Sequence, residues 1–177
     1  VIGGPGIDVV QLLGAGVLVT VDTAETIIGS DGSDSITITS DGDVAIFGNA
    51  GDDDVLLMGT SGSTLLIGGI ETIVGGDGGD SLTIEIGDIV TADGGAGIDT
   101  IAFFGHADFV NVDLAAGTVN DAAGISFNLD NFENVVGTDG SDTIVGSNAK
   151  NILIGGLGDD HLIGALGTLS GGNGNDV

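Results

Sequence analysis

The chain has 177 residues, of which 36 are glycine, 27 are acidic and one, Lys150, is basic, so its formal net charge is −26. This balance excludes nucleic acid as a partner, because phosphate recognition needs several Lys and Arg side chains. It also excludes attraction to an anionic membrane surface. The chain contains no cysteine, which leaves its compartment open.

The charge and the apolar residues occupy different parts of the sequence. Hydrophobic residues make up 41% of the chain, in short Ile, Leu and Val runs that alternate with Gly and Asp clusters, a pattern typical of strands joined by turns. The longest apolar stretch, residues 9–21, is too short and too interrupted to span a bilayer, so we expect no membrane insertion. A compact fold would crowd carboxylates at the turns, and bound cations would relieve their repulsion.

A nine-residue pattern recurs along the chain, with Gly at positions one and four, Asp at position six and an apolar residue at position eight. Its copies are GGPGIDVVQ at Gly3, GSDGSDSIT at Gly29, GNAGDDDVL at Gly48, GGDGGDSLT at Gly75, GGAGIDTIA at Gly94, GTDGSDTIV at Gly137, GGLGDDHLI at Gly155 and a truncated copy at Gly171. Because the sequence opens and stops inside copies of this pattern, we expect it to be a segment of a longer array.

Two copies are degenerate and a longer unit also repeats. GTSGSTLLI at Gly59 has Thr64 where Asp is expected, and GSNAKNILI at Gly146 has Asn151 there. The longer unit is thirteen residues: AETIIGSDGSDSI from Ala24, IETIVGGDGGDSL from Ile70 and FENVVGTDGSDTI from Phe132. Its acidic position, occupied by Glu25, Glu71 and Glu133, predicts structural or ligand residues before catalytic ones.

The repeat spacing predicts an all-β fold, a parallel β-roll or β-solenoid of about 18–19 residues per coil. Stacked coils would place each turn over the equivalent turn of the next, so that position-six carboxylates form ladders along both edges. The step from Gly48 to Gly75 is three nonamers, or one and a half coils. We therefore expect the Gly29 and Gly48 turns on one edge and the Gly75 and Gly94 turns on the other.

Residues 103–131 break the repeat with longer alternating strands and predict an irregular β insertion, either a local hairpin or a broader coil. The expected organisation is thus N-terminal coils in residues 1–102, the insertion in 103–131 and C-terminal coils in 132–177.

The nonapeptide suits a hard cation. Ca²⁺ takes six to eight oxygens from carboxylates and backbone carbonyls, and the nonamer offers a short Asp carboxylate beside glycines whose positive φ would turn carbonyls inward. One turn supplies about half of such a shell, so we expect an ion between two stacked turns.

At this point GGLGDDHLI, GGDGGDSLT and GGAGIDTIA resemble the calcium-binding nonapeptides of the repeats-in-toxin (RTX), hemolysin-type family, and so does the stretch from Phe132 to Gly164. The resemblance implies carboxylate ligands at Asp34, Asp53, Asp80, Asp99, Asp142, Asp160 and Asp176, and at Asp8, whose turn is altered by Pro5. It implies further ligands from the same turns at Asp31, Asp77, Asp139, Gly32, Gly51, Gly76, Gly78, Gly95, Gly97, Gly140, Gly156 and Gly158. Turns that carry Asn151 or Thr64 are expected to be weak or empty.

Three other interpretations compete with this one. The Gly and Asp clusters are also ordinary turn formers, which would suit a metal-free solenoid. His106 and His161 lack partners at a zinc-site spacing. Adjacent carboxylates such as Asp52 and Asp53 could act as acid and base, but the repeat explains them, and we expect no enzyme.

The resemblance also implies type I secretion and folding in extracellular calcium. We expect several Ca²⁺ ions, a location outside the cell or at its surface, and either of two roles. One is structural, in a surface layer, adhesin or filament, with copies of the chain or neighbouring repeats as partners. The other is a secretion and folding module attached to a toxin or enzyme. The mean hydropathy of +0.47 favours assembly, because exposed β faces need to be covered.

Overall fold

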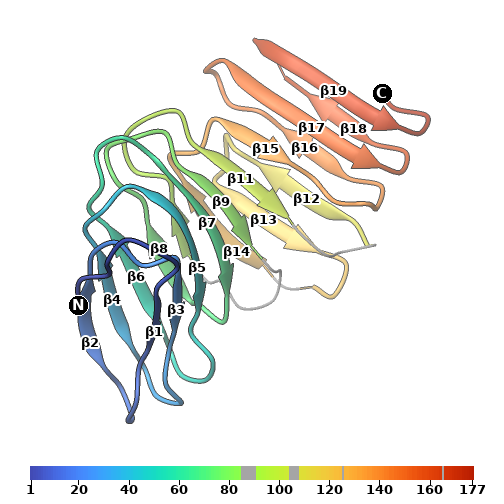
Figure 1. Cartoon of the computed structure of the whole chain (residues 1–177). Coiled ribbons are helices and arrows are strands. Elements are labelled where there is room, and N and C mark those ends of the chain that lie inside the picture. The colour runs from blue at the N-terminus through green and yellow to red at the C-terminus, as the bar shows by residue number, and fades with distance from the viewer. Residues whose placement is uncertain (85–90, 104–107, 125, 165) are drawn as a thin grey trace.

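The computed structural model describes residues 1–177 except 85–90, 104–107, 125 and 165. The described residues form two stacked sheets and no helix, so none of them forms a helix long and apolar enough to cross a membrane. The chain passes alternately from one sheet to the other and completes about eight turns of about 19 residues each (Figure 1). The predicted β-solenoid is confirmed.

The strands of the two sheets follow each other in chain order, apart from one insertion. The first sheet has the order β1 (Val9–Gln11), β3 (Thr26–Ile28), β5 (Gly42–Phe47), β7 (Ser63–Gly68), β9 (Ser81–Ile84), β11 (Thr100–Phe103), β15 (Asn134–Val136), β17 (Asn151–Leu157), β19 (Gly167–Asn173). The second has the order β18 (His161–Ile163), β16 (Thr143–Val145), β12 (Val110–Asp113), β13 (Thr118–Asp121), β14 (Ser126–Asp130), β10 (Thr91–Asp93), β8 (Thr72–Val74), β6 (Asp54–Leu57), β4 (Ser35–Ile38), β2 (Leu18–Val21).

The strands are short and alternate between buried and exposed residues, because successive side chains of a strand point to opposite faces. In β9 and β11, for example, Ser and Thr face outward while Leu82, Ile84 and Ile101 are fully buried. The parallel register places apolar residues of neighbouring strands next to each other, so Leu82 pairs with Leu65 on one side and with Ile101 on the other. These apolar ladders form the core between the sheets.

Strands β12, β13 and β14 widen the second sheet. Strand β13 runs antiparallel to both β12 and β14, while β14 and β12 join the neighbouring coils in parallel. In the first sheet, β11 pairs directly with β15 at this level. The ring centroids of Phe103 and Phe127 lie 6.4 Å apart in the space between the sheets. The division of the chain into three parts at residues 102 and 131 stays a prediction, and both sheets continue through these positions.

The buried ladder predicts a strong position dependence for truncation of isoleucine. Ile101 is 0% exposed, whereas Ile98, three residues earlier in the turn, is 68% exposed. We expect Ile101→Ala to lower the free energy of unfolding by about 2–5 kcal/mol and Ile98→Ala to change it little, as measured by urea unfolding in saturating calcium. Similar losses for both variants would contradict the described packing.

Candidate metal sites

The position-six aspartates lie in the turns at the two edges of the roll. Edge 1 is defined as the turns that lead from the first sheet to the second, and edge 2 as those that lead back. Asp34 and Asp53 lie on edge 1, directly before β4 and β6, whereas Asp80 and Asp99 lie on edge 2, directly before β9 and β11. The expected change of edge between Gly48 and Gly75 is confirmed.

On edge 1 the first ladder joins four successive coils through backbone–carboxylate hydrogen bonds. The N–H of Asp34 donates to Oδ1 of Asp53 at 2.7 Å, and the N–H of Asp53 donates to Oε2 of Glu71 at 2.6 Å. Each carboxylate thus reaches back to the preceding coil. The ladder begins at Val17, whose N–H donates to Asp34 Oδ1 at 2.6 Å.

The second ladder repeats this arrangement on edge 2. The N–H of Asp80 donates to Oδ1 of Asp99 at 2.6 Å, and the N–H of Asp99 donates to Oε2 of Glu133 at 2.8 Å. It begins at Ser63, whose N–H donates to Asp80 at 2.6 Å. Ser63, and not Thr64, therefore occupies the place of a position-six residue, because this turn is one residue shorter than a nonapeptide turn; Thr64 is exposed on β7.

The third ladder returns to edge 1. The N–H of Asp142 donates to Asp160 at 2.8 Å, and that of Asp160 donates to Asp176 at 3.0 Å. Asp8 lies on edge 2 and donates its N–H to Glu25 at 2.7 Å. The structure therefore groups the eight predicted aspartates into short ladders that alternate between the edges.

The ladders contain two turn conformations. In the first turns of the three ladders, those of Asp34, Asp80 and Asp142, no residue has positive φ, and the N–H of the position-two residue donates to the Asp of its own turn: Ser30 to Asp34, Gly76 to Asp80 and Thr138 to Asp142. In the second turns, positions two and four both have positive φ, as at Gly95 (90°) and Gly97 (153°).

The expected left-handed glycines are therefore found only in the second turns, at Gly51, Gly95, Gly97, Gly156 and Gly158. For Gly32, Gly76, Gly78 and Gly140 the expectation is wrong. These glycines are required by close packing instead, because a side chain there would overlap the backbone of the neighbouring coil. The carbonyl of Gly76, an expected ligand, accepts a hydrogen bond from Ala96 at 2.9 Å.

The second-turn aspartates are buried and incompletely bonded. Asp53, Asp99 and Asp160 are at most 1% exposed, and within the described part of the chain Oδ2 of each has no hydrogen-bond partner. A buried carboxylate oxygen without a donor is costly, because only a donor or a cation replaces the lost water. These three oxygens are the observation that fits a bound cation.

The position-one glycines make room for the carboxylate of their own turn. A side chain at Gly29, Gly48 or Gly155 would collide with the Asp Oδ2 of its own turn and with a carbonyl oxygen of the next coil. Two oxygens from adjacent coils thus meet above one α-carbon. No group of three acidic or histidine side chains converges within the described part of the chain, so a cation would need carboxylates completed by such carbonyls, which suits Ca²⁺.

The environment changes the pKa of several ladder carboxyls. Burial, together with the charges of Asp80 and Glu133 and against the hydrogen bond from the Asp80 N–H, raises the pKa of Asp99 to about 6. Burial also raises the pKa of Asp53 and of Asp160, with smaller contributions from neighbouring carboxylates. For Asp34, burial is outweighed by hydrogen bonds from Ser30 and Val17, which lower its pKa.

The remaining predicted residues are placed apart from the ladders. Asp31, Asp77 and Asp139 are exposed at the tips of first turns. Asn151 is buried, and its amide donates to the carbonyl of Glu133 at 2.7 Å. In that turn the side-chain N–H of Asn151 therefore binds the carbonyl oxygen that an ion would otherwise contact. His161 is exposed on β18, and His106 lies outside the described residues.

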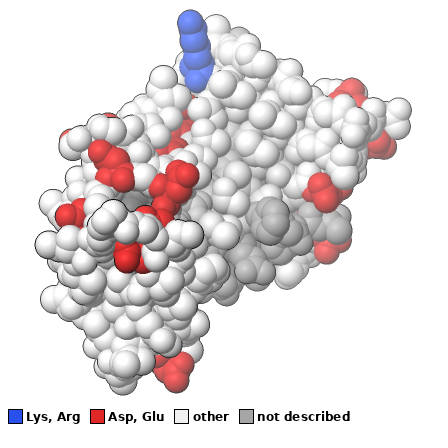
Figure 2. All heavy atoms as spheres, in the orientation of Figure 1, with Lys and Arg blue, Asp and Glu red and all other residues white. Residues whose placement is uncertain are grey.

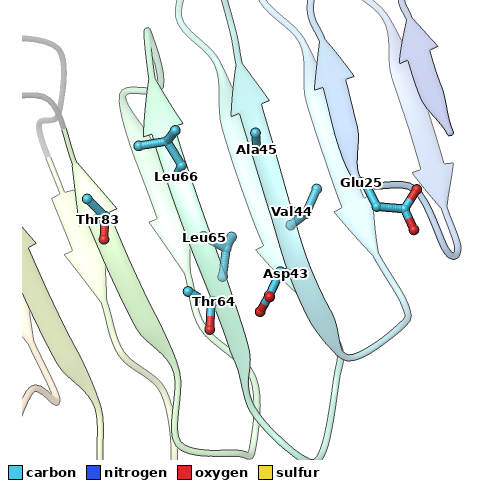
Figure 3. Close-up of a pocket in the computed structure, with 8 residues that line it drawn as sticks. All are labelled: Glu25, Asp43, Val44, Ala45, Thr64, Leu65, Leu66 and Thr83. Carbon is cyan, nitrogen blue, oxygen red and sulfur yellow. The ribbon is translucent and has the colours of Figure 1, made fainter. Parts of the chain in front are cut away.

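The surface also carries acidic patches, one lysine and a groove. The acidic side chains visible in Figure 2 lie in separate patches, and exposed Lys150 projects from the roll. A shallow groove of about 530 Å³ lies on the outer face of the first sheet, across β5, β7 and β9 (Figure 3). Its lining is mainly aliphatic and threonine side chains, with exposed Asp43 and Glu25 as its acidic groups.

The raised pKa values predict a pH dependence for the metal-free chain. A folded-state pKa of about 6 for Asp99, above the ordinary value near 3.8, means that the folded state binds more protons than the unfolded state between these values. In excess chelator, lowering the pH from about 7.5 to about 5 should therefore shift the chain toward the folded state, seen as a gain of β signal in circular dichroism. Asp99→Asn should reduce this dependence, and Asp130→Asn, an exposed control, should not. A β signal that falls over this interval would contradict the assignment.

The comparison with known protein families agrees with this geometry. A family model described as the RTX calcium-binding nonapeptide repeat, in four copies, matches residues 20–37 and 136–168. No curated protein matches the chain. The matched residues include the turns of Asp34, Asp142 and Asp160, and the turns of Asp53, Asp80 and Asp99 repeat the same hydrogen bonds outside them. The chain therefore carries RTX calcium-binding nonapeptide repeats, folded as a β-roll.

Proposed function

We propose that the chain folds when it binds several Ca²⁺ ions outside the cell, and that the folded roll has a structural role and is not an enzyme. The observation that carries the proposal is the set of buried Oδ2 atoms on Asp53, Asp99 and Asp160, which have no hydrogen-bond partner among the residues that the structure describes. At neutral pH each of these carboxylates is repelled by the neighbouring carboxylates of its own ladder, and a divalent cation offsets both the repulsion and the lost hydration.

The energetics suit a switch between compartments. A site with a dissociation constant near ~10⁻⁴ M contributes about 1.4 kcal/mol when free calcium is ~10-fold higher. Several sites together would contribute an amount comparable to the whole stability of a domain. Such a chain would stay unfolded in the low calcium of a cytosol and fold after secretion, as the RTX resemblance implies.

Outward-facing apolar side chains support a role in assembly. Phe47 and Leu66 lie on the outer face of the first sheet, and Leu56 and Met58 on that of the second, with 39–59% of their surfaces exposed. Flat β faces with exposed apolar residues favour association. The partners would be further copies of the chain or neighbouring repeats.

Circular dichroism during a calcium titration of the full chain tests the proposed folding switch. We expect a cooperative transition to β structure with Ca²⁺ and no comparable transition with Mg²⁺, which keeps its water and demands octahedral geometry. A β signal that is unchanged in excess chelator would mean a metal-independent solenoid and would refute the proposal.

The size of the folded chain tests the structural role. We expect sedimentation in saturating calcium to show ordered oligomers, and Leu66→Ser together with Met58→Ser to reduce them without changing the number of ions bound. A chain that remains a monomer at high concentration would instead favour a folding and secretion module of a larger protein.

A further inference from the structure

The glutamates of the thirteen-residue unit occupy one structural position. Oε2 of Glu25, Glu71 and Glu133 accepts the N–H of Asp8, Asp53 and Asp99, at 2.7, 2.6 and 2.8 Å. Each glutamate thus stands where the next coil of a ladder would carry another position-six aspartate, although the segment before it is not a nonapeptide. Nine residues later the chain places Asp34, Asp80 or Asp142 on the opposite edge. The glutamates therefore mark the points where the ladder changes edge.

The backbone before each glutamate is also the same. Thr23, Gly69 and Asn131, each two residues before the glutamate, have φ values of 54°, 61° and 57°. Only one of the three is glycine, and a β-branched residue such as Thr rarely adopts positive φ. The carbonyl oxygens of these residues approach Gly3, Gly48 and Gly94, the position-one glycines of the preceding turns.

Two of these places also contain an unsatisfied buried carboxylate. Asp53 and Asp99 are 0% exposed, and no described residue forms a hydrogen bond with their Oδ2 atoms. Oδ2 of Asp53 and the carbonyl oxygen of Gly69 both lie against the α-carbon of Gly48. The buried oxygen and the carbonyl supplied with Glu71 therefore face the same space.

The third place, at Asp8 and Glu25, lacks the unsatisfied oxygen and serves as an internal comparison. Asp8 is only partly buried, and its Oδ2 already accepts the N–H of Gly4 at 2.7 Å. Glu25 is exposed. The hydrogen bond from the Asp N–H to the Glu carboxylate is thus present here without the unsatisfied oxygen.

We propose that Glu71 with Asp53, and Glu133 with Asp99, each hold a calcium ion, completed by the carbonyl oxygens of Gly69 and Asn131. Each pair carries two negative charges, which one divalent cation neutralises, and carboxylate and carbonyl oxygens are the ligands that Ca²⁺ prefers. The glutamates lie outside the nonapeptide pattern, so this inference rests on the proposed calcium binding and extends it to ligands that the repeat does not contain.

Substitution by glutamine separates a ligand from a structural acceptor. Gln keeps the length of the side chain and an oxygen that accepts the Asp N–H, but it removes the negative charge. We expect Glu71→Gln and Glu133→Gln in the full chain each to lose about one bound Ca²⁺, or to weaken one class of sites at least ~10-fold, in equilibrium dialysis with Ca²⁺ alone. The double variant should lose about two.

Two controls match the change in charge. Asp54→Asn removes an exposed carboxylate adjacent to Asp53, and Glu25→Gln alters the same structural position where the neighbouring Asp is already bonded. Both should keep the wild-type number of ions. An unchanged number in the Glu71 and Glu133 double variant would overturn the inference, whereas a wild-type chain that binds no Ca²⁺ would overturn the proposed function itself.

A variant that does not fold in saturating calcium is resolved by a second substitution. Glu71→Asp keeps the charge but shortens the side chain. If Glu71→Gln fails to fold, Glu71→Asp should restore the β signal and the full number of ions, because the carboxylate is the essential group. Failure of both variants would show that the reach of the hydrogen bond to Asp53 matters and not the charge, and would contradict a ligand role.

Discussion

The hydrogen bond from a backbone N–H to the aspartate carboxylate of the next coil is the interaction on which the roll depends. A carboxylate in these turns accepts the N–H of the position-six residue one coil earlier, as Asp53 does for Asp34. The bond fixes the distance between coils and buries the acid at the same time. Burial of an acceptor-only group then creates the need for a cation, because one bond does not satisfy two oxygens. Architecture and metal binding thus arise from the same side chain.

The two turn conformations differ in whether the second carboxylate oxygen has a donor. In first turns the position-two N–H donates to the second carboxylate oxygen, as Gly76 does for Asp80. In second turns a positive φ at position two, as at Gly95, accompanies the loss of that donor and leaves Oδ2 of Asp99 unsatisfied. Each of the three ladders therefore contains a first-turn aspartate whose two oxygens both accept hydrogen bonds and a second-turn aspartate whose Oδ2 lacks a donor among the described residues, and the third ladder adds Asp176. The second turn is thus the place where a cation is needed.

Alternation between edges has a consequence for the shape of the charge distribution. A continuous ladder would collect all carboxylates along one side, whereas the glutamate-terminated ladders divide them between the two edges. Repulsion between buried acids is thereby limited to a few neighbours, such as Asp80 and Glu133 around Asp99. The insertion at β12 and β13 falls inside the second ladder, between Asp99 and Glu133, and the ladder crosses it because the first sheet passes directly from β11 to β15.

The sequence by itself determined the β-solenoid, the coil length, the change of edge between Gly48 and Gly75 and the position-six aspartates, because each is encoded in a short repeat with a constant period. The tertiary structure decided what depends on contacts between coils. Glu133 reaches Asp99 across 34 residues, a separation that no fixed period reveals, although its place in the thirteen-residue unit was a signal. Ser63 replaced Thr64, and first-turn glycines kept ordinary φ, because the backbone of the adjacent coil, and not the local sequence, sets the conformation of a stacked turn.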